Sequence, residues 1–172
     1  MKKAVADTSA LVSLSFSGQL APASKALHIF VPMQVKKELE EIAAFADEKA
    51  AAAKEALSII KSGAIQAKTV DAKKAEALVN KNVDFGEAEC FQLATEREIP
   101  VMLMDDLNAG FALEGMAKAR GISIKISAAA VVELANRKQI TKKTAKESLL
   151  KMVKRRNWEK TTLEYLIHKY FP

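Results

Sequence analysis

In the segment "PVMLMDDLNAG" (residues 100–110), five mostly apolar residues are followed directly by two adjacent aspartates, and a helical pattern begins after them. The segment "KKAVADTSALVSL" (residues 2–14) repeats this arrangement, with Asp7 at the end of its apolar run. A short apolar run bounded by polar residues is typical of a buried strand. Because ligands bind beyond the carboxyl ends of the strands in open parallel sheets, both segments predict carboxylates at one edge of such a sheet.

Strand and helix patterns alternate along most of the chain. Strands are expected at residues 2–7, 27–32, 64–70, 100–104 and 122–126. Helices are expected at residues 8–17, 33–46, 47–63, 71–80, 86–97 and 107–119. Because strands separated by helices pair in parallel through right-handed crossovers, the pattern predicts a three-layer α/β sandwich with a central parallel sheet. A chain of 172 residues suits one domain, so we expect a single domain at 1–172, with 127–172 as a helical C-terminal extension.

The helical extension carries much of the positive charge. Residues 137–160 hold ten lysines and arginines against two glutamates, in a chain of net charge +6. This basic segment is either a solvated helix face or a footprint for a polyanion such as RNA. Charge alone leaves both interpretations open; in the second, Lys154, Arg155 and Arg156 are the expected RNA contacts. A closing helix is expected to place Leu163, Leu166, Ile167 and Tyr170 on one face.

Composition excludes several other classes of protein. No apolar run approaches the roughly 18 residues of a membrane span, so no membrane segment is expected. The single cysteine, Cys90, excludes an internal disulfide and a multi-cysteine zinc site, which favours a cytoplasmic location. No glycine-rich loop has the spacing of a nucleotide-binding motif.

Helical projection selects two further carboxylates. Glu38 lies roughly 60° from the centre of the apolar stripe of its helix, whereas Glu40 and Glu41 point well away. Glu87 and Glu89 are roughly 200° apart on their helix, and Glu87 shares the face of the apolar residues around Cys90. Glu38 and Glu87 are therefore the inward candidates.

Each candidate also has an ordinary structural explanation. Asp7 and Asp106 precede helices and suit N-caps, Asp84 and Glu87 match a capping box, and Glu38 can extend towards solvent. If the carboxylates converge instead, they raise one another's pKa unless a cation neutralises them. An all-oxygen site suits Mg²⁺ or Mn²⁺, which serve phosphoryl chemistry by activating water.

Three segments together resemble the PIN-domain ribonucleases, especially the small prokaryotic proteins related to VapC-type toxins. The segments are "VADTSALVSLSFSGQL" (5–20), "VPMQVKKELEEI" (31–42) and "FGEAECFQLATEREIPVMLMDDLNAG" (85–110). The resemblance covers almost the whole chain and implies a set of site residues: the metal carboxylates Asp7, Glu38, Glu87 and Asp106, with Asp105 a close alternative to Asp106, and Ser9 as a supporting hydroxyl. The chain departs from the pattern at Glu87, where many PIN toxins have Asp, and at Met104, where many have a hydroxyl residue.

The resemblance implies an endoribonuclease that depends on Mg²⁺ or Mn²⁺ and hydrolyses RNA phosphodiester bonds with a metal-bound water. Toxin members of the family pair with an antitoxin protein and form homodimers, so both are expected partners beside RNA. A non-catalytic RNA-binding PIN module is the alternative, because the two departures permit it. A phosphatase-like domain fits less well, because such enzymes have a second aspartate where Ser9 stands.

Overall fold

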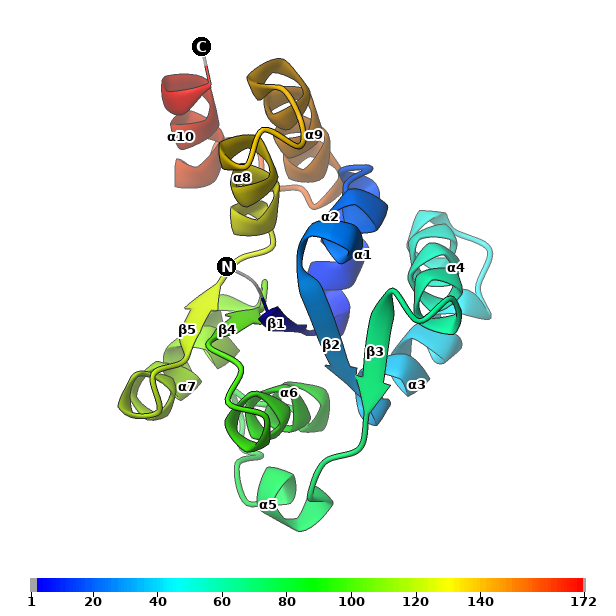
Figure 1. The fold of residues 1–172 in the computed structure, drawn as a ribbon, viewed down its shortest axis with the longest axis vertical. Coiled ribbons are helices and arrows are strands. Elements are labelled where there is room, and N and C mark those ends of the chain that lie inside the picture. The colour runs from blue at the N-terminus through cyan, green and yellow to red at the C-terminus, as the bar shows by residue number, and fades with distance from the viewer. Residues whose placement is uncertain (1–2, 172) are drawn as a thin grey trace.

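The computed structural model describes residues 3–171, and over that range five strands and ten helices alternate (Figure 1). The strands are β1 (Lys3–Ala6), β2 (His28–Pro32), β3 (Ile65–Lys68), β4 (Val101–Leu103) and β5 (Ser123–Lys125). They form one sheet in the order β3-β2-β1-β4-β5, and every pairing is parallel. The predicted central parallel sheet is therefore confirmed.

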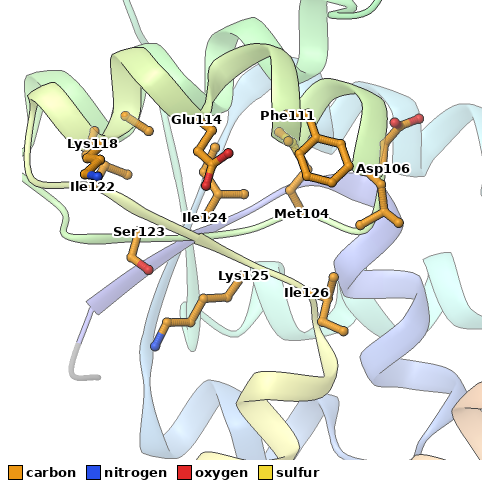
Figure 2. A pocket seen from close by; sticks show the side chains of 13 residues that line it. Met104, Asp106, Phe111, Glu114, Lys118, Ile122, Ser123, Ile124, Lys125 and Ile126 are labelled. Atoms are coloured by element: carbon orange, nitrogen blue, oxygen red, sulfur yellow. The ribbon is translucent and has the colours of Figure 1, made fainter. Parts of the chain in front are cut away.

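Helices cover both faces of the sheet and complete the predicted three-layer sandwich (Figure 1). One layer contains α1 (Thr8–Phe16), α2 (Leu20–Ala26), α3 (Met33–Ala43) and α4 (Glu48–Lys61). The other contains α5 (Ala72–Glu76), α6 (Phe85–Glu96) and α7 (Leu107–Ala119). In this second layer, α6 packs on β1, β2 and β4, while α7 packs on β5. A groove remains between α7 and β5, the edge strand on that side (Figure 2).

The neighbouring strands β1 and β4 mark the point where the chain changes direction across the sheet. The connection after β1 covers one face, and the connection after β4 covers the other (Figure 1). Val5 pairs with Met102 and Ala6 with Leu103. The backbone N–H of Asp7 continues this ladder by donating to the carbonyl of Leu103 at 3.1 Å. Ligand crevices in α/β proteins form at such switch points.

Two helices differ from the sequence prediction. Helix α2 was not predicted, although its Pro22 lies in the first turn, where a proline removes no intrahelical hydrogen bond. Helix α5 ends at Glu76 and not near residue 80. The chain turns there because Asn80 bridges to Val83 and its side chain accepts from the N–H of Asn82 at 2.9 Å.

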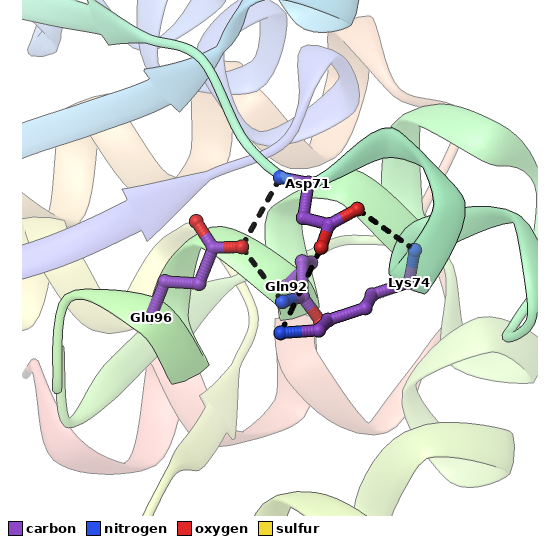
Figure 3. Close-up of polar contacts among 4 residues, drawn as sticks. All are labelled: Asp71, Lys74, Gln92 and Glu96. Atoms are coloured by element: carbon purple, nitrogen blue, oxygen red, sulfur yellow. Dashed lines mark hydrogen bonds and ion pairs between the residues drawn. The ribbon is translucent and has the colours of Figure 1, made fainter.

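Side-chain contacts tie the start of α5 to the end of α6 (Figure 3). Asp71 caps α5, as predicted, by accepting from the backbone N–H of Lys74. Glu96 accepts from the backbone N–H of Asp71 at 3.1 Å and from Gln92 Nε2 at 2.8 Å. The connection from β3 is thereby held against α6.

The C-terminal extension consists of α8 (Ala128–Asn136), α9 (Lys142–Arg155) and α10 (Thr162–Tyr170). Its buried apolar residues belong to the same hydrophobic core as the sheet. The four residues predicted to share one face of α10 are covered unequally: Ile167 is buried and Leu163 partly buried, but Leu166 and Tyr170 are exposed. Helix α10 packs mainly on α9, so only a narrow stripe of it is covered. Within residues 3–171, no helix has the length and apolar character needed to cross a membrane.

Small side chains on α4 allow close contact with α1 and α3, and this predicts a position-specific cost of adding volume. Ala53 is fully buried, whereas Ala51 is exposed on the same helix. Ala53→Leu should lower the free energy of unfolding by about 1–3 kcal/mol through overpacking. Ala51→Leu, the matched control, should change it by less than about 0.5 kcal/mol. Equilibrium urea unfolding measures both, and equal effects would contradict the packing.

Candidate functional site

A cleft of about 190 Å³ opens beyond the carboxyl end of β1, where the N-terminal ends of α1, α3, α6 and α7 meet. Its lining comprises Asp7, Thr8, Ser9, Val35, Glu38, Asp84, Gly86, Glu87 and Asp106. Five of these residues are acidic, and no lysine, arginine or histidine is among them. The cleft is therefore a concentration of negative charge within a basic protein.

Asp7 lies deepest, between the end of β1 and the start of α1. Its Oδ1 accepts from the backbone N–H of Ala10 at 2.6 Å, and its Oδ2 accepts from Ser9 Oγ at 2.9 Å. Burial raises the pKa of Asp7 to about 8, and the negative charges of Asp105 and Glu87 add to the rise. The hydrogen bonds from Ala10 and Ser9 oppose it. An isolated carboxylate here is costly, so a neighbouring cation would stabilise it.

Glu38 reaches the cleft from the side of α3, as the helical projection indicated. Its Oε2 accepts from Thr8 Oγ1 at 2.5 Å, and its Oε1 accepts from Gln34 Nε2 at 3.2 Å. Burial raises the pKa of Glu38 above its ordinary value, and these two hydrogen bonds limit the rise. Glu38 is half-buried, whereas Glu40 and Glu41 on the same helix are exposed.

Gly86 makes room for the Glu38 carboxylate. A Cβ atom at Gly86 would lie 2.4 Å from Glu38 Oε1. The first turn of α6 therefore approaches α3 more closely than any residue with a side chain would allow.

Glu87 and Asp106 come from the starts of the second-layer helices. Glu87 and Asp84 form a capping box: the N–H of Asp84 donates to Glu87 Oε2 at 2.9 Å, and the N–H of Glu87 donates to Asp84 Oδ1 at 2.8 Å. Burial raises the pKa of Glu87 to about 7, with contributions from the charges of Asp84, Asp106 and Glu38. Asp106 is exposed and caps α7 through Oδ1 alone, which accepts from Asn108 and Ala109. Within residues 3–171, no group donates to its Oδ2.

Asp105 is separated from the cleft by its hydrogen bonds. Its Oδ1 accepts from the backbone N–H of Ser127 at 2.7 Å, and its Oδ2 accepts from Ser127 Oγ at 2.8 Å. Both oxygens are thus used at the start of the C-terminal extension, and Asp105 is not part of the cleft lining. Of the two adjacent aspartates, the structure brings Asp106 to the cleft.

Glu89 points away from Glu87, as projected, but it is buried. It accepts from the backbone N–H of Gln34 at 3.2 Å, at the start of α3. The projection selected Glu87 as the inward residue, but α6 is buried along its whole middle, so Glu89 is buried as well.

The donor atoms of the cleft are of the kind that binds a divalent cation, although its side chains do not converge on a single position. Its donors are carboxylate and hydroxyl oxygens, which Mg²⁺ and Mn²⁺ prefer. Within residues 3–171, no three acidic, histidine or cysteine side chains lie close enough to ligate one ion. Helix capping draws one oxygen of Glu87 and one of Asp106 into hydrogen bonds and leaves the other without a donor. The capping and ligand interpretations are therefore compatible.

The basic segment does not line the cleft. Arg155 forms an ion pair with Glu48, and the Arg156 guanidinium lies 5.3 Å from the centre of the Trp158 ring. Lys154 is exposed on α9. A contact between these residues and RNA stays a prediction.

Sequence reasoning did not assign four residues of the cleft to the site: Thr8, Val35, Asp84 and Gly86. Asp84 was interpreted only as a helix cap, although its carboxylate adds to the charge of the cleft. The positions of Thr8, directly after Asp7, and of Gly86, directly before Glu87, were the only sequence signals.

The fold and cleft define a PIN-like α/β protein, and comparison with known families agrees. The PIN domain family matches residues 3–169. The chain therefore belongs to the PIN-domain family, whose members are generally nucleases that act on nucleic acid and use divalent metals. The comparison with curated proteins finds no match.

The buried carboxyls predict that stability falls as pH rises. The ordinary pKa values of Asp7 and Glu87 are 3.8 and 4.5, whereas their values in the folded protein are about 8 and about 7. Between these values the folded protein binds more protons than the unfolded chain, so raising the pH from about 4 to about 8 destabilises it. The melting temperature without divalent metal should therefore fall over this range. Asp7→Asn should flatten the profile, and a melting temperature that rises instead would contradict the assignment.

Because Gly86 lies against the Glu38 carboxylate, we predict that adding a side chain at Gly86 displaces this carboxylate. Gly86→Ala should displace the Glu38 carboxylate and weaken Mn²⁺ affinity by about tenfold or more, in the range found for residues that support metal ligands. Gly115→Ala is the matched control, because Gly115 lies in α7 and a Cβ there meets nothing within 4 Å. Isothermal titration with Mn²⁺ compares the two proteins. Unchanged affinity in Gly86→Ala would exclude Glu38 from the metal site.

Proposed function

We propose that the protein is a divalent-metal-dependent endoribonuclease that hydrolyses RNA phosphodiester bonds, and that it acts as the toxin of a toxin–antitoxin pair. Membership of the PIN-domain family supports the nuclease assignment. Five carboxylates in one cleft, with no basic side chain and with the pKa values of Asp7 and Glu87 raised, support the metal dependence.

In this proposal Asp7, Glu38, Glu87 and Asp106 hold Mg²⁺ or Mn²⁺. The bound ion would activate a water molecule and stabilise the leaving oxygen. Ser9 and Thr8 orient the carboxylates of Asp7 and Glu38 through their hydroxyl groups. Because positive partial charge gathers at helix N-termini, the starts of α1, α6 and α7 also favour the approach of a phosphate.

A non-catalytic RNA-binding module is the second candidate function. The cleft carboxylates are held by caps and hydroxyl groups, and no three of them lie within reach of one ion. A protein that kept these contacts in solution would bind RNA without cleaving it. The experiment that follows separates the two functions.

Replacing Asp7 tests the catalytic assignment directly. Asp7→Asn keeps the cap of α1, because Asn caps a helix about as well as Asp, but it removes the carboxylate from the metal site. Cleavage of a single-stranded RNA at saturating Mn²⁺ should fall by about a hundredfold or more. At a pH above about 8, where Asp7 is ionised, the melting temperature without metal should not fall, because one charge leaves a repulsive cluster.

Asp47→Asn is the matched control. Asp47 caps α4 by accepting from the backbone N–H of Ala50 at 2.8 Å, outside the cleft. This variant should keep wild-type cleavage. If Asp7→Asn cleaves RNA as fast as the wild-type protein, the site assignment is wrong. If the wild-type protein itself shows no divalent-dependent cleavage, the non-catalytic module is favoured.

A further inference from the structure

The groove between α7 and β5 lies next to the cleft. Its volume is about 360 Å³, and its walls come from the side of α7 and from the outer edge of the sheet (Figure 2). Asp106 lines both the groove and the cleft, so the two hollows meet at this residue. A strand with one phosphate bound in the cleft would therefore have its neighbouring nucleotides close to α7.

An aromatic ring stands in this path with little cover. Phe111 is 72% exposed, and its ring lies beside Asp106 on α7 (Figure 2). Asp106, the N-cap of α7, and Phe111 are five positions apart, which corresponds to a rise of about 7.5 Å along a helix axis. The side chain of Leu107 is also exposed at this end of α7. An exposed ring is costly in water, and stacking against a flat ligand would cover it.

Charged side chains divide the groove along its length. Lys118 lies at the far end of α7 from Asp106, whereas the side chain of Lys125 extends from β5 to the side of the strand away from α7 (Figure 2). Glu114 lies between Phe111 and Lys118 on α7. A phosphate is repelled beside Glu114 and attracted near Lys118, whereas a nucleobase with amino groups can donate to Glu114.

We propose that this groove holds single-stranded RNA next to the scissile phosphate, with one base stacked on Phe111 and the following backbone held by Lys118. The inference rests on the proposed function, because it assumes that the strand crosses the cleft. Aromatic rings and flanking lysines bind single strands in this way without reading their sequence. A double helix does not fit, because its bases are stacked inside and cannot reach the ring.

The test combines a protein variant with an RNA that lacks one base. Affinity is measured by fluorescence anisotropy in an Asp7→Asn background, which prevents cleavage, for a short single-stranded RNA and for versions with the base removed at each position in turn. Phe111→Ala should weaken binding of the intact RNA by roughly tenfold, within the range for one stacked base. Removing the base that stacks on Phe111 should weaken RNA binding by the same factor in the protein that retains Phe111. The same base removal should have no further effect in the Phe111→Ala protein. Phe111→Tyr should retain the affinity.

Tyr165→Ala is the matched control, because Tyr165 is 64% exposed on α10 and lines neither hollow. It should leave RNA affinity unchanged. If the loss of RNA affinity caused by Phe111→Ala adds to the loss caused by every base removal, the stacking proposal is wrong. The proposed nuclease function would still hold in that case if the wild-type protein cleaves RNA in a divalent-dependent reaction. Unchanged RNA affinity together with a changed oligomeric state in Phe111→Ala would also overturn it and identify the groove as a protein interface. Absence of any RNA binding would overturn it as well.

Discussion

The parallel pairing of β1 with β4 is the constraint on which the site depends. Two residue pairs and the bond from the Asp7 N–H to Leu103 fix the ends of these strands side by side. Asp7 and Asp106 are almost a hundred positions apart in the sequence, and this ladder brings them to one edge. A slip of one residue would move Val5 and Met102 to the opposite face of the sheet, which is also buried and packed against different helices. The packing of both faces therefore also protects the alignment of the carboxylates.

The cleft places two demands on the same side chains. Helix starts need acceptors for their free N–H groups, and carboxylates supply them at α1, α6 and α7. Burial raises the pKa values of Asp7 and Glu87, and repulsion between neighbouring carboxylates adds to the rise. Capping offsets part of the cost of gathering negative charge and keeps the fold stable before any cation arrives.

Local patterns were sufficient to predict the sheet, most helices and the orientation of Glu38, because strand ends and helix faces follow from short-range periodicity. They failed where tertiary contacts decide. Nothing local distinguishes Asp105 from Asp106; the partner that separates them, Ser127, lies 22 positions away. Glu89 is buried because the start of α3 lies against it. The early end of α5 is different, because the turn at Asn80, whose bridging partner is Val83, is a local feature that the sequence analysis missed.

The bond between Asp105 and Ser127 has a consequence for dividing the chain. Ser127 Oγ donates to Asp105 Oδ2 and lies 3.4 Å from Met152 Sδ on α9, so one hydroxyl group links the edge of the site to the C-terminal helices. A fragment that stops before Ser127 would lose both donors that hold Asp105, the residue next to Asp106. The C-terminal helices are therefore part of the support of the segment that carries Asp106.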